Sequence, residues 1–247
     1  MERYIGKVAV VTGSSSGIGA AISKELVKKG MKVAGLARRI ERLEELKKQL
    51  SKESGQFFAV KCDIRSEEDI VNAFKWVETN LGGVDVLVNN AGVHQMTNLT
   101  EGDAEKWRTV FDTNVLGLCI ATREAVKSMK KRQVTGHIIH INSIAGHRVS
   151  PELAPIRNVY SASKFAVRAL AETLRLELAH NKLKIKVSNI SPGYVKTEFQ
   201  VAGGQTELPE YLKNGPYLIP ENLADAVVYV LSTPPNVDVS EITLHPF

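Results

Sequence analysis

Cysteine is scarce in this sequence, in which only Cys62 and Cys119 occur among 247 residues. Two cysteines cannot build the framework of several disulfides that stabilises small secreted domains. Cys62 lies beside the end of an apolar segment and Cys119 lies within another, and neither has the spacing of a zinc site. We therefore expect a reducing compartment and no bound metal.

Long hydrophobic runs are also absent, and no apolar stretch approaches the roughly 20 residues that span a bilayer. The first expected strand begins near Lys7, which leaves no room for a signal peptide. We find no internal repeat, linker or low-complexity tract, so residues 1–247 are expected to form a single domain. These absences predict a cytoplasmic protein without a membrane span.

Aromatic residues are few, at 6% of the chain, and they do not interleave with the basic residues that give a formal net charge of +5. The lysines and arginines are spread over helix-like segments, as at Lys24, Lys47 and Lys130. Such a distribution is typical of solvated helix faces, and no nucleic-acid-binding motif accompanies it. We expect no nucleic-acid partner, although part of the positive charge suits an anionic cofactor.

Short apolar segments alternate with segments whose apolar residues recur every three or four positions. The expected strands cover residues 8–11, 32–37, 57–61, 84–88, 137–142, 184–190 and 241–245. The expected helices include 107–129, 160–181 and 220–232. This alternation predicts an α/β fold with one doubly wound, parallel, seven-stranded sheet and helices on both faces. Ligands bind at the carboxyl ends of the strands in such sheets.

A glycine-rich stretch, Thr12-Gly13-Ser14-Ser15-Ser16-Gly17-Ile18-Gly19, follows the first strand. Its glycines lack the Cβ atoms that would prevent a tight turn and a close approach to a ligand. The N–H groups at the start of the following helix attract phosphate. A plain strand-to-helix turn is the alternative, but the flanking strand and helix favour a dinucleotide site. The expected cofactor contacts are Gly13, Ser15, Ser16, Gly17, Ile18 and Gly19.

The end of the second strand indicates which dinucleotide is bound. An acidic residue there binds the ribose 2′-hydroxyl of NAD, whereas arginine accommodates the 2′-phosphate of NADP. Ala37 occupies the acidic position, and Arg38 and Arg39 follow it. This arrangement favours NADP over NAD. A basic helix start is the other interpretation, although positive charge at a helix N-terminus is mildly unfavourable.

Polar residues also follow the third and fourth strands. Asp63 can accept the adenine amino group, with Ile64 beside it, although a turn-forming aspartate is an equal alternative. The fourth strand leads into Asn89-Asn90-Ala91-Gly92, where small and amide residues let the backbone approach the cofactor. We expect cofactor contacts from Asn90, Ala91 and Gly92.

Tyr160 and Lys164 lie one helical turn apart, on one face of an expected helix. Tyrosine titrates near pH ~10, and a nearby cation lowers its pKa towards the neutral range. Tyrosine can then donate a proton to a carbonyl that is being reduced, or accept one from an alcohol that is being oxidised. By itself such a pair is most often an exposed pair on a helix, so it needs further motifs.

Those motifs are present: TGxxxGIG, NNAG, Asn114 in an NVxG pattern, Ser143 and the Tyr160–Lys164 pair occur in this order along the chain. Together they resemble the short-chain dehydrogenase/reductase family over essentially the whole sequence, which implies a Rossmann fold. The resemblance implies that Tyr160 is the general acid/base and that Lys164 holds the nicotinamide ribose. It also implies that Ser143 binds the substrate oxygen and that Asn114 orders a proton-relay water. The segment implied to flank the nicotinamide contains Pro192, Gly193, Val195 and Thr197.

The substrate region departs from the usual family pattern. Ser143 and Tyr160 are 17 positions apart, a few more than usual, because residues 146–151 and those after them form a longer loop. This loop resembles the branch that contains insect farnesol dehydrogenases and vertebrate dehydrogenase/reductase member eleven. A lid is expected at about 193–220, with apolar residues such as Phe199 and Leu208, and we expect substrate contacts from Ser143, Tyr160, His94 and Phe199.

These observations favour an NADP(H)-dependent oxidoreductase that acts on an apolar alcohol or carbonyl. Ordinary packing of the lid on the body is the other explanation of its apolar residues. A reductase of a polar substrate, such as a 3-oxoacyl thioester, and a non-catalytic NADP-binding sensor remain alternatives. The resemblance also implies a homodimer or homotetramer, built on the long helices around Asn114 and Tyr160.

Overall fold

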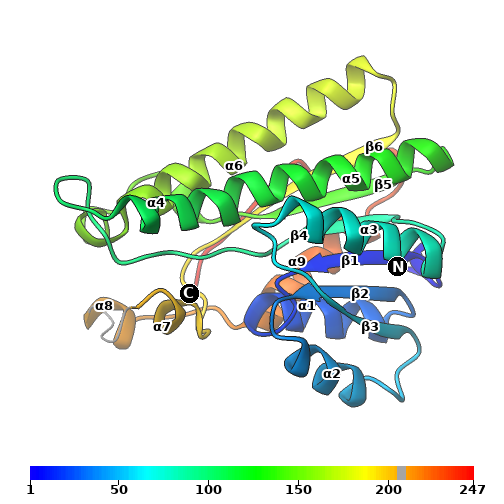
Figure 1. Ribbon diagram of the computed structural model, residues 1–247, viewed down its shortest axis with the longest axis horizontal. Helices are drawn as coiled ribbons and strands as arrows, with labels where there is room; N and C mark the ends of the chain where they lie inside the picture. Colours follow the sequence, from blue (N-terminus) through cyan, green and yellow to red (C-terminus); the bar gives the residue numbers. More distant parts are fainter. Residues whose placement is uncertain (205–209) are drawn as a thin grey trace.

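The computed structural model describes residues 1–204 and 210–247, and its centre is a seven-stranded sheet in the order β3-β2-β1-β4-β5-β6-β7 (Figure 1). Every neighbouring pair of strands is parallel. The strands are β1 (Val8–Thr12), β2 (Lys32–Ala37), β3 (Gln56–Lys61), β4 (Val86–Asn89), β5 (Gly136–Ile141), β6 (Ile185–Pro192) and β7 (Glu241–Leu244). The predicted doubly wound parallel sheet is confirmed. Its order reverses between β1 and β4, which opens a crevice at their carboxyl ends.

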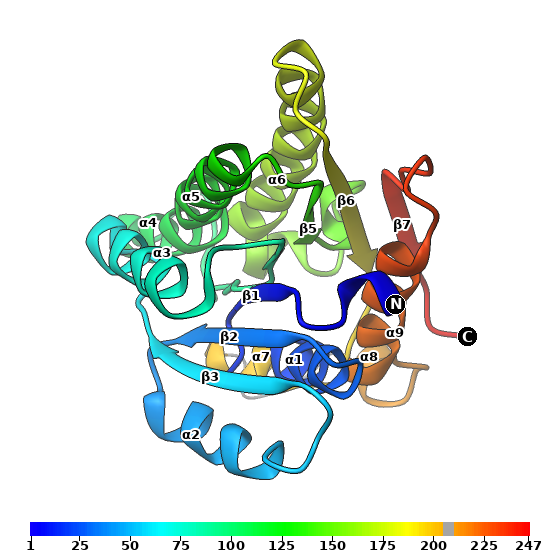
Figure 2. The same cartoon turned by 90° about the vertical axis from the view of Figure 1, so that its right-hand side faces the viewer.

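Helices cover both faces of the sheet (Figure 2). One face carries α1 (Gly17–Lys28), α2 (Ile40–Gln49) and α9 (Pro220–Ser232). The other carries α3 (Glu67–Leu81), α4 (Ala104–Phe111), α5 (Gly117–Arg132) and α6 (Ala154–His180). The short helices α7 (Phe199–Ala202) and α8 (Glu210–Lys213) lie beyond the carboxyl ends of the strands, at the left of Figure 1. Single turns of 3-10 helix occur at η1 (Glu2–Tyr4) and η3 (Ile144–Gly146).

The pattern of burial along β1 explains the two layers. Successive side chains of a strand point to opposite faces, and every residue of β1 is buried. Ala9 and Val11 pack with the residues of α1 and α9, whereas Val8 and Val10 pack with those of α3 and α5. A central parallel strand therefore consists of a continuous apolar run.

The helix expected over 107–129 lies within a continuous helical segment, residues 104–132, that contains one irregular turn. A π-helical segment, η2 (Asp112–Leu116), separates α4 from α5. It contains Asn114, whose side chain bonds to the backbone of Val93 and to Ser163. A π turn inserts an extra residue into a helix, a feature frequent at functional sites. The prediction of helical structure over 107–129 is confirmed, whereas the π-helical segment within it was not predicted.

The helix expected over 160–181 begins earlier, at Ala154, and has a kink at Arg157 (φ −141°, ψ 32°). The predicted strands agree with the structure to within one or two residues. At the start of α3, Ser66 Oγ caps the helix by accepting a hydrogen bond from Asp69 N.

Two features are absent from the described part of the chain. No helix there combines the length and apolar character needed to cross a bilayer. Nor do three or more histidine, cysteine or acidic side chains gather there into a set able to bind a metal ion.

Candidate active site

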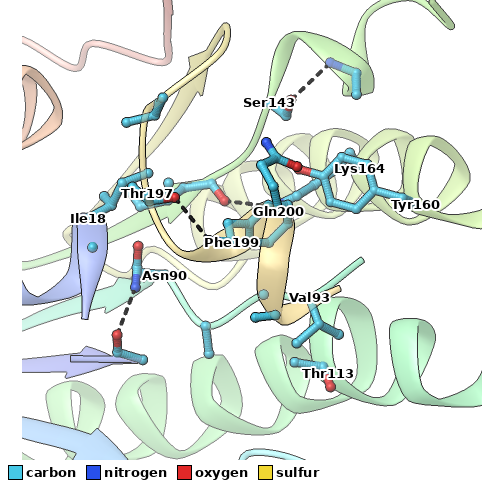
Figure 3. A pocket seen from close by; sticks show the side chains of 18 of the residues that line it. Ile18, Asn90, Val93, Thr113, Ser143, Tyr160, Lys164, Thr197, Phe199 and Gln200 are labelled. Atoms are coloured by element: carbon cyan, nitrogen blue, oxygen red, sulfur yellow. Dashed lines mark hydrogen bonds between the residues drawn. The ribbon is translucent and has the colours of Figure 1, made fainter. Parts of the chain in front are cut away.

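A cavity of about 990 Å³ opens at the carboxyl ends of the central strands, where the crevice of the sheet lies. Its wall comes from segments far apart in the sequence, including the glycine-rich loop, the residues after β2 to β5, and α6 and α7 (Figure 3). The predicted site residues in this wall are Gly13, Ser15, Ser16, Gly17, Ile18, Arg38, Arg39, Asp63, Ile64, Asn90, Ala91, Gly92, Ser143, Tyr160, Lys164, Pro192, Gly193, Val195, Thr197 and Phe199. One space therefore joins almost all of them, while Gly19, His94 and Asn114 lie behind it.

The glycine-rich loop has the close approaches that its glycines require. Gly13 has φ +72°, and a Cβ atom there would lie 3.0 Å from the Ala91 Cα atom. A Cβ atom on Gly19 would overlap the Gly13 carbonyl and the Asn90 side chain. Asn90 in turn donates from Nδ2 to the Thr12 carbonyl at 2.9 Å. Gly19 is therefore required so that the loop can pack this closely against Gly13 and Asn90. The cavity beside the loop remains open for a ligand.

The cavity has two arms, and the one beside the glycine-rich loop, Arg38, Arg39 and Asp63 has hydrogen-bond donors that suit a dinucleotide. Within the described chain, no side chain caps the start of α1, and uncapped N–H groups at a helix N-terminus bind phosphate. Arg39 Nη2 donates to Ser15 Oγ at 3.1 Å and to Ser16 Oγ at 3.0 Å. Asp63, which was expected near the adenine, forms an ion pair with Arg65 at 2.6 Å, and the hydrogen bond from Arg65 lowers the pKa of Asp63.

The other arm of the cavity is the part lined by Ser143, Tyr160 and Lys164. Burial raises the pKa of Tyr160, while a hydrogen bond with Ser143 and the positive charge of Arg157 act in the opposite direction. Burial also lowers the pKa of Lys164 to about 8. Its Nζ atom donates to the Ile141 carbonyl at 3.0 Å and lies 5.8 Å from the centre of the Tyr160 ring.

The expected lowering of the tyrosine pKa by Lys164 is therefore not found, and this expectation is corrected. Lys164 is buried and Tyr160 is half-buried in the same cavity wall, so loss of hydration acts on both, and for Tyr160 it outweighs the favourable charges. The result is a protonated tyrosine at neutral pH.

Asn114 braces the segments around the two arms. Its Oδ1 atom accepts from Val93 N at 2.8 Å, and its Nδ2 atom donates to the Val93 carbonyl at 2.8 Å and to Ser163 Oγ at 3.0 Å. The side chain is 1% exposed. It thereby connects the loop after β4 to α6, one helical turn from Tyr160.

His94, expected to contact the substrate, is fully buried one layer behind the wall. Its ring lies 4.9 Å from the ring of Phe199 and 6.3 Å from that of Tyr160, measured between centroids. Burial lowers the pKa of His94 to about 4, so the ring is neutral. Phe199 and Tyr160 lie 5.7 Å apart, and both belong to the cavity wall.

Two polar residues in the arm around Tyr160, Arg157 and Gln200, were not predicted from the sequence. Arg157 is 5% exposed, lines the cavity and donates to the Gln200 side-chain carbonyl, which is also buried. Arg157 precedes Tyr160 by three positions, and this helical spacing was the available signal. No sequence signal marks Gln200, because its place depends on how α7 packs against α6.

The longer loop after Ser143 reaches the cavity, as Arg148, Val149 and Leu153 line it. His147 anchors the loop, since its Nε2 atom lies 3.0 Å from Ser191 Oγ.

In the expected lid, the wall includes Val195 and Phe199, whereas Val201 is 71% exposed. Leu208 and the rest of 205–209 lie outside the described residues.

This chain is similar to several known proteins in sequence and in overall fold. The family model described as short chain dehydrogenase matches residues 7–207. A farnesol dehydrogenase of Aedes aegypti is 52% identical, over 100% of this chain and 98% of its own length. Dehydrogenase/reductase SDR family member 11 of Mus musculus is 43% identical, over 100% and 96%. The closed form of a serine dehydrogenase complexed with NADP+ superposes with a TM-score of 0.85 at 32% identity, over 96% of this chain and 93% of that one.

Proposed function

Because the chain belongs to the short-chain dehydrogenase/reductase family, whose members are oxidoreductases, we propose that it interconverts an alcohol and its carbonyl by hydride transfer with NADP(H). The observation that carries the proposal is the single cavity, which joins the glycine-rich loop and the Arg38–Arg39 pair to Ser143, Tyr160 and Lys164. The presence of NADP+ in a related solved structure supports the choice of dinucleotide.

We assign the parts of the dinucleotide to the two arms of the cavity. The pyrophosphate fits the start of α1, with Ser15, Ser16, Gly17 and Ile18, and the 2′-phosphate fits Arg38 and Arg39. Asp63 and Ile64 flank the adenine, and Asn90, Ala91 and Gly92 support the middle of the molecule. Lys164 holds the nicotinamide ribose, and Pro192, Gly193, Val195 and Thr197 flank the nicotinamide. When bound, the nicotinamide supplies or accepts the hydride.

The chain's own residues move the proton and position the substrate oxygen. Tyr160, protonated at neutral pH, donates its proton to the oxygen of a carbonyl that is being reduced. Ser143, which is hydrogen-bonded to Tyr160, donates to the same oxygen and holds it beside the phenol. Asn114, in keeping with the family resemblance, orders a water through which the tyrosine regains a proton. The raised pKa of Tyr160 suits reduction, because the donor stays protonated.

The apolar part of the wall supports a lipophilic substrate. Val149, Leu153 and Phe199 line the cavity, and the ring of Phe199 lies 5.7 Å from that of Tyr160. We propose a farnesol-like terpenoid, a steroid or another lipophilic carbonyl, in line with the similarity to a farnesol dehydrogenase. The cavity is large enough for such a molecule beside the cofactor.

A polar substrate, such as a 3-oxoacyl thioester, is the second candidate, and the Arg157–Gln200 pair favours it. A buried guanidinium in a cavity wall is suited to a hydrogen-bond acceptor on the ligand. Turnover of a panel of apolar and polar carbonyls distinguishes the two candidates.

For the assembly we propose a cytoplasmic homodimer or homotetramer formed through the helices around η2 and α6. Apolar side chains are exposed there, at Phe111 (38%), Leu116 (52%), Phe165 (41%) and Leu176 (67%). Such a surface is typical of contacts between subunits.

The arginine assignment makes a prediction about cofactor choice. Arg39→Ala and Arg38→Ala are each expected to weaken NADPH binding by about ten- to hundredfold, because a hydrogen bond to a charged group contributes about 1.5–3 kcal/mol. NADH lacks the 2′-phosphate, so its affinity should stay close to that of the unmodified protein. Fluorescence titration of both dinucleotides measures this. Equal losses for NADPH and NADH would show that neither arginine binds the phosphate.

A further inference from the structure

Two arginines near the start of α2 share one carboxylate oxygen of Glu198. Arg42 Nη1 lies 2.7 Å from Glu198 Oε2, and Arg39 Nη1 lies 3.6 Å from the same atom. Arg39 is the N-cap residue of α2, and Arg42 lies three positions further on, in its first turn. The hydrogen bond from Arg42, with the charges of both arginines, lowers the pKa of Glu198. An ionised carboxylate therefore stands opposite two guanidiniums.

The residue before Glu198 packs against the glycine-rich loop, which places Glu198 near that loop. Thr197 precedes it, and a Cβ atom on Gly17 would lie 3.2 Å from Thr197 Cγ2. Arg39, which pairs with Glu198, also donates to Ser15 Oγ at 3.1 Å. One guanidinium thus contacts both the phosphate loop and the carboxylate, and Glu198 and Arg39 both belong to the cavity wall.

We propose that the Glu198 carboxylate occupies the 2′-phosphate subsite in the free protein, and that Arg42 is a further ligand of the phosphate that displaces it. The inference rests on the proposed use of NADP(H). A phosphate monoester carries about −1.5 to −2 charges at neutral pH and offers three acceptor oxygens. It therefore pairs with Arg39 and Arg42 more strongly than one carboxylate does. Glu198 acts as an internal competitor that opposes the phosphate and leaves NAD(H) unaffected.

The experiment uses two fragments of the dinucleotides, 2′,5′-ADP and 5′-AMP, with their dissociation constants measured by calorimetry on the full chain. Glu198→Gln keeps the size of the side chain and removes its charge. It is expected to tighten 2′,5′-ADP binding about two- to fivefold, the range for exposed ion pairs, and to leave 5′-AMP unchanged. Arg42→Ala is expected to weaken 2′,5′-ADP alone. In the Arg42→Ala background, Glu198→Gln should give a smaller gain.

Glu78→Gln is the matched control. Glu78 pairs with Lys131 between α3 and α5, and its loss changes the net charge by the same amount. This control should leave both fragments unchanged. An equal gain in affinity for 2′,5′-ADP in Glu78→Gln and Glu198→Gln would show that the effect comes from net charge alone, and it would overturn the inference. Weaker 5′-AMP binding in Glu198→Gln would make Glu198 a ribose ligand and would also overturn it.

Failure of the inference is distinguishable from failure of the proposed cofactor. If the unmodified protein binds 2′,5′-ADP no better than 5′-AMP, the NADP(H) proposal fails, and the inference with it. If the unmodified protein prefers 2′,5′-ADP but Glu198→Gln changes nothing, only the competitor role of Glu198 is refuted.

Discussion

Tyr160→Phe is expected to lower kcat by about 10²- to 10⁴-fold while NADPH binds as tightly as before. The substitution removes the hydroxyl that donates the proton, and proton transfer by a positioned side chain contributes a factor of this size. The phenylalanine ring keeps the contacts with His94 and Phe199 that hold the wall in place. Steady-state kinetics with NADPH and a carbonyl, together with a fluorescence titration of NADPH, separate the two effects.

Tyr229→Phe is the control for this substitution. Tyr229 lies on α9 and is 59% exposed, so loss of its hydroxyl should change neither kcat nor the affinity for NADPH. Turnover of Tyr160→Phe at the rate of the unmodified protein would refute the role of Tyr160 as acid and base.

Gly19→Ala is expected to destabilise the fold and to abolish NADPH binding. In an ordinary helix this change would stabilise by about 1 kcal/mol, because alanine has the higher helix propensity. Here the added Cβ atom would overlap the Gly13 carbonyl, which belongs to the backbone and cannot rotate away. Overpacking typically costs about 1–3 kcal/mol, so the net effect is a loss of stability. Displacement of Gly13 also distorts the loop that holds the phosphates.

Gly82→Ala serves as the control for Gly19→Ala. Nothing lies within 4 Å of a Cβ atom at Gly82, although its φ of +86° is unfavourable for alanine. Gly82→Ala should therefore cost about 1–2 kcal/mol and leave the affinity for NADPH unchanged. Urea unfolding and NADPH titration of both variants measure these effects. Normal NADPH affinity in Gly19→Ala would contradict the geometry assigned to the loop.

The fold and most of the cavity wall could be predicted because their signals are local. The glycine-rich loop, Asn90 and the Tyr160–Lys164 pair each follow from a short motif attached to one strand or helix. In a parallel sheet the carboxyl ends of the strands meet at one edge, so motifs that follow different strands come together. Identification of the elements was therefore enough to place these residues in one site.

The remaining features depend on contacts between distant segments. Arg42 and Glu198 are 156 positions apart, and neither belongs to a motif. The pairing of Arg157 with Gln200 depends on the kink in α6 and on the position at which α7 packs against it. The direction of the tyrosine pKa could not be predicted either, because burial of Tyr160 exists only in the folded chain.

The most direct test of the account is the fate of the hydride in a reaction with NADPH that carries deuterium at both C4 positions. The protein is offered farnesal, a ketosteroid, an aromatic dione and a 3-oxoacyl thioester, and the products are analysed by mass spectrometry. The account predicts an alcohol with one deuterium on its carbinol carbon, formed faster from an apolar carbonyl than from the thioester. Tight binding of NADPH without deuterium transfer to any of them would contradict it and would favour a non-catalytic NADP-binding sensor.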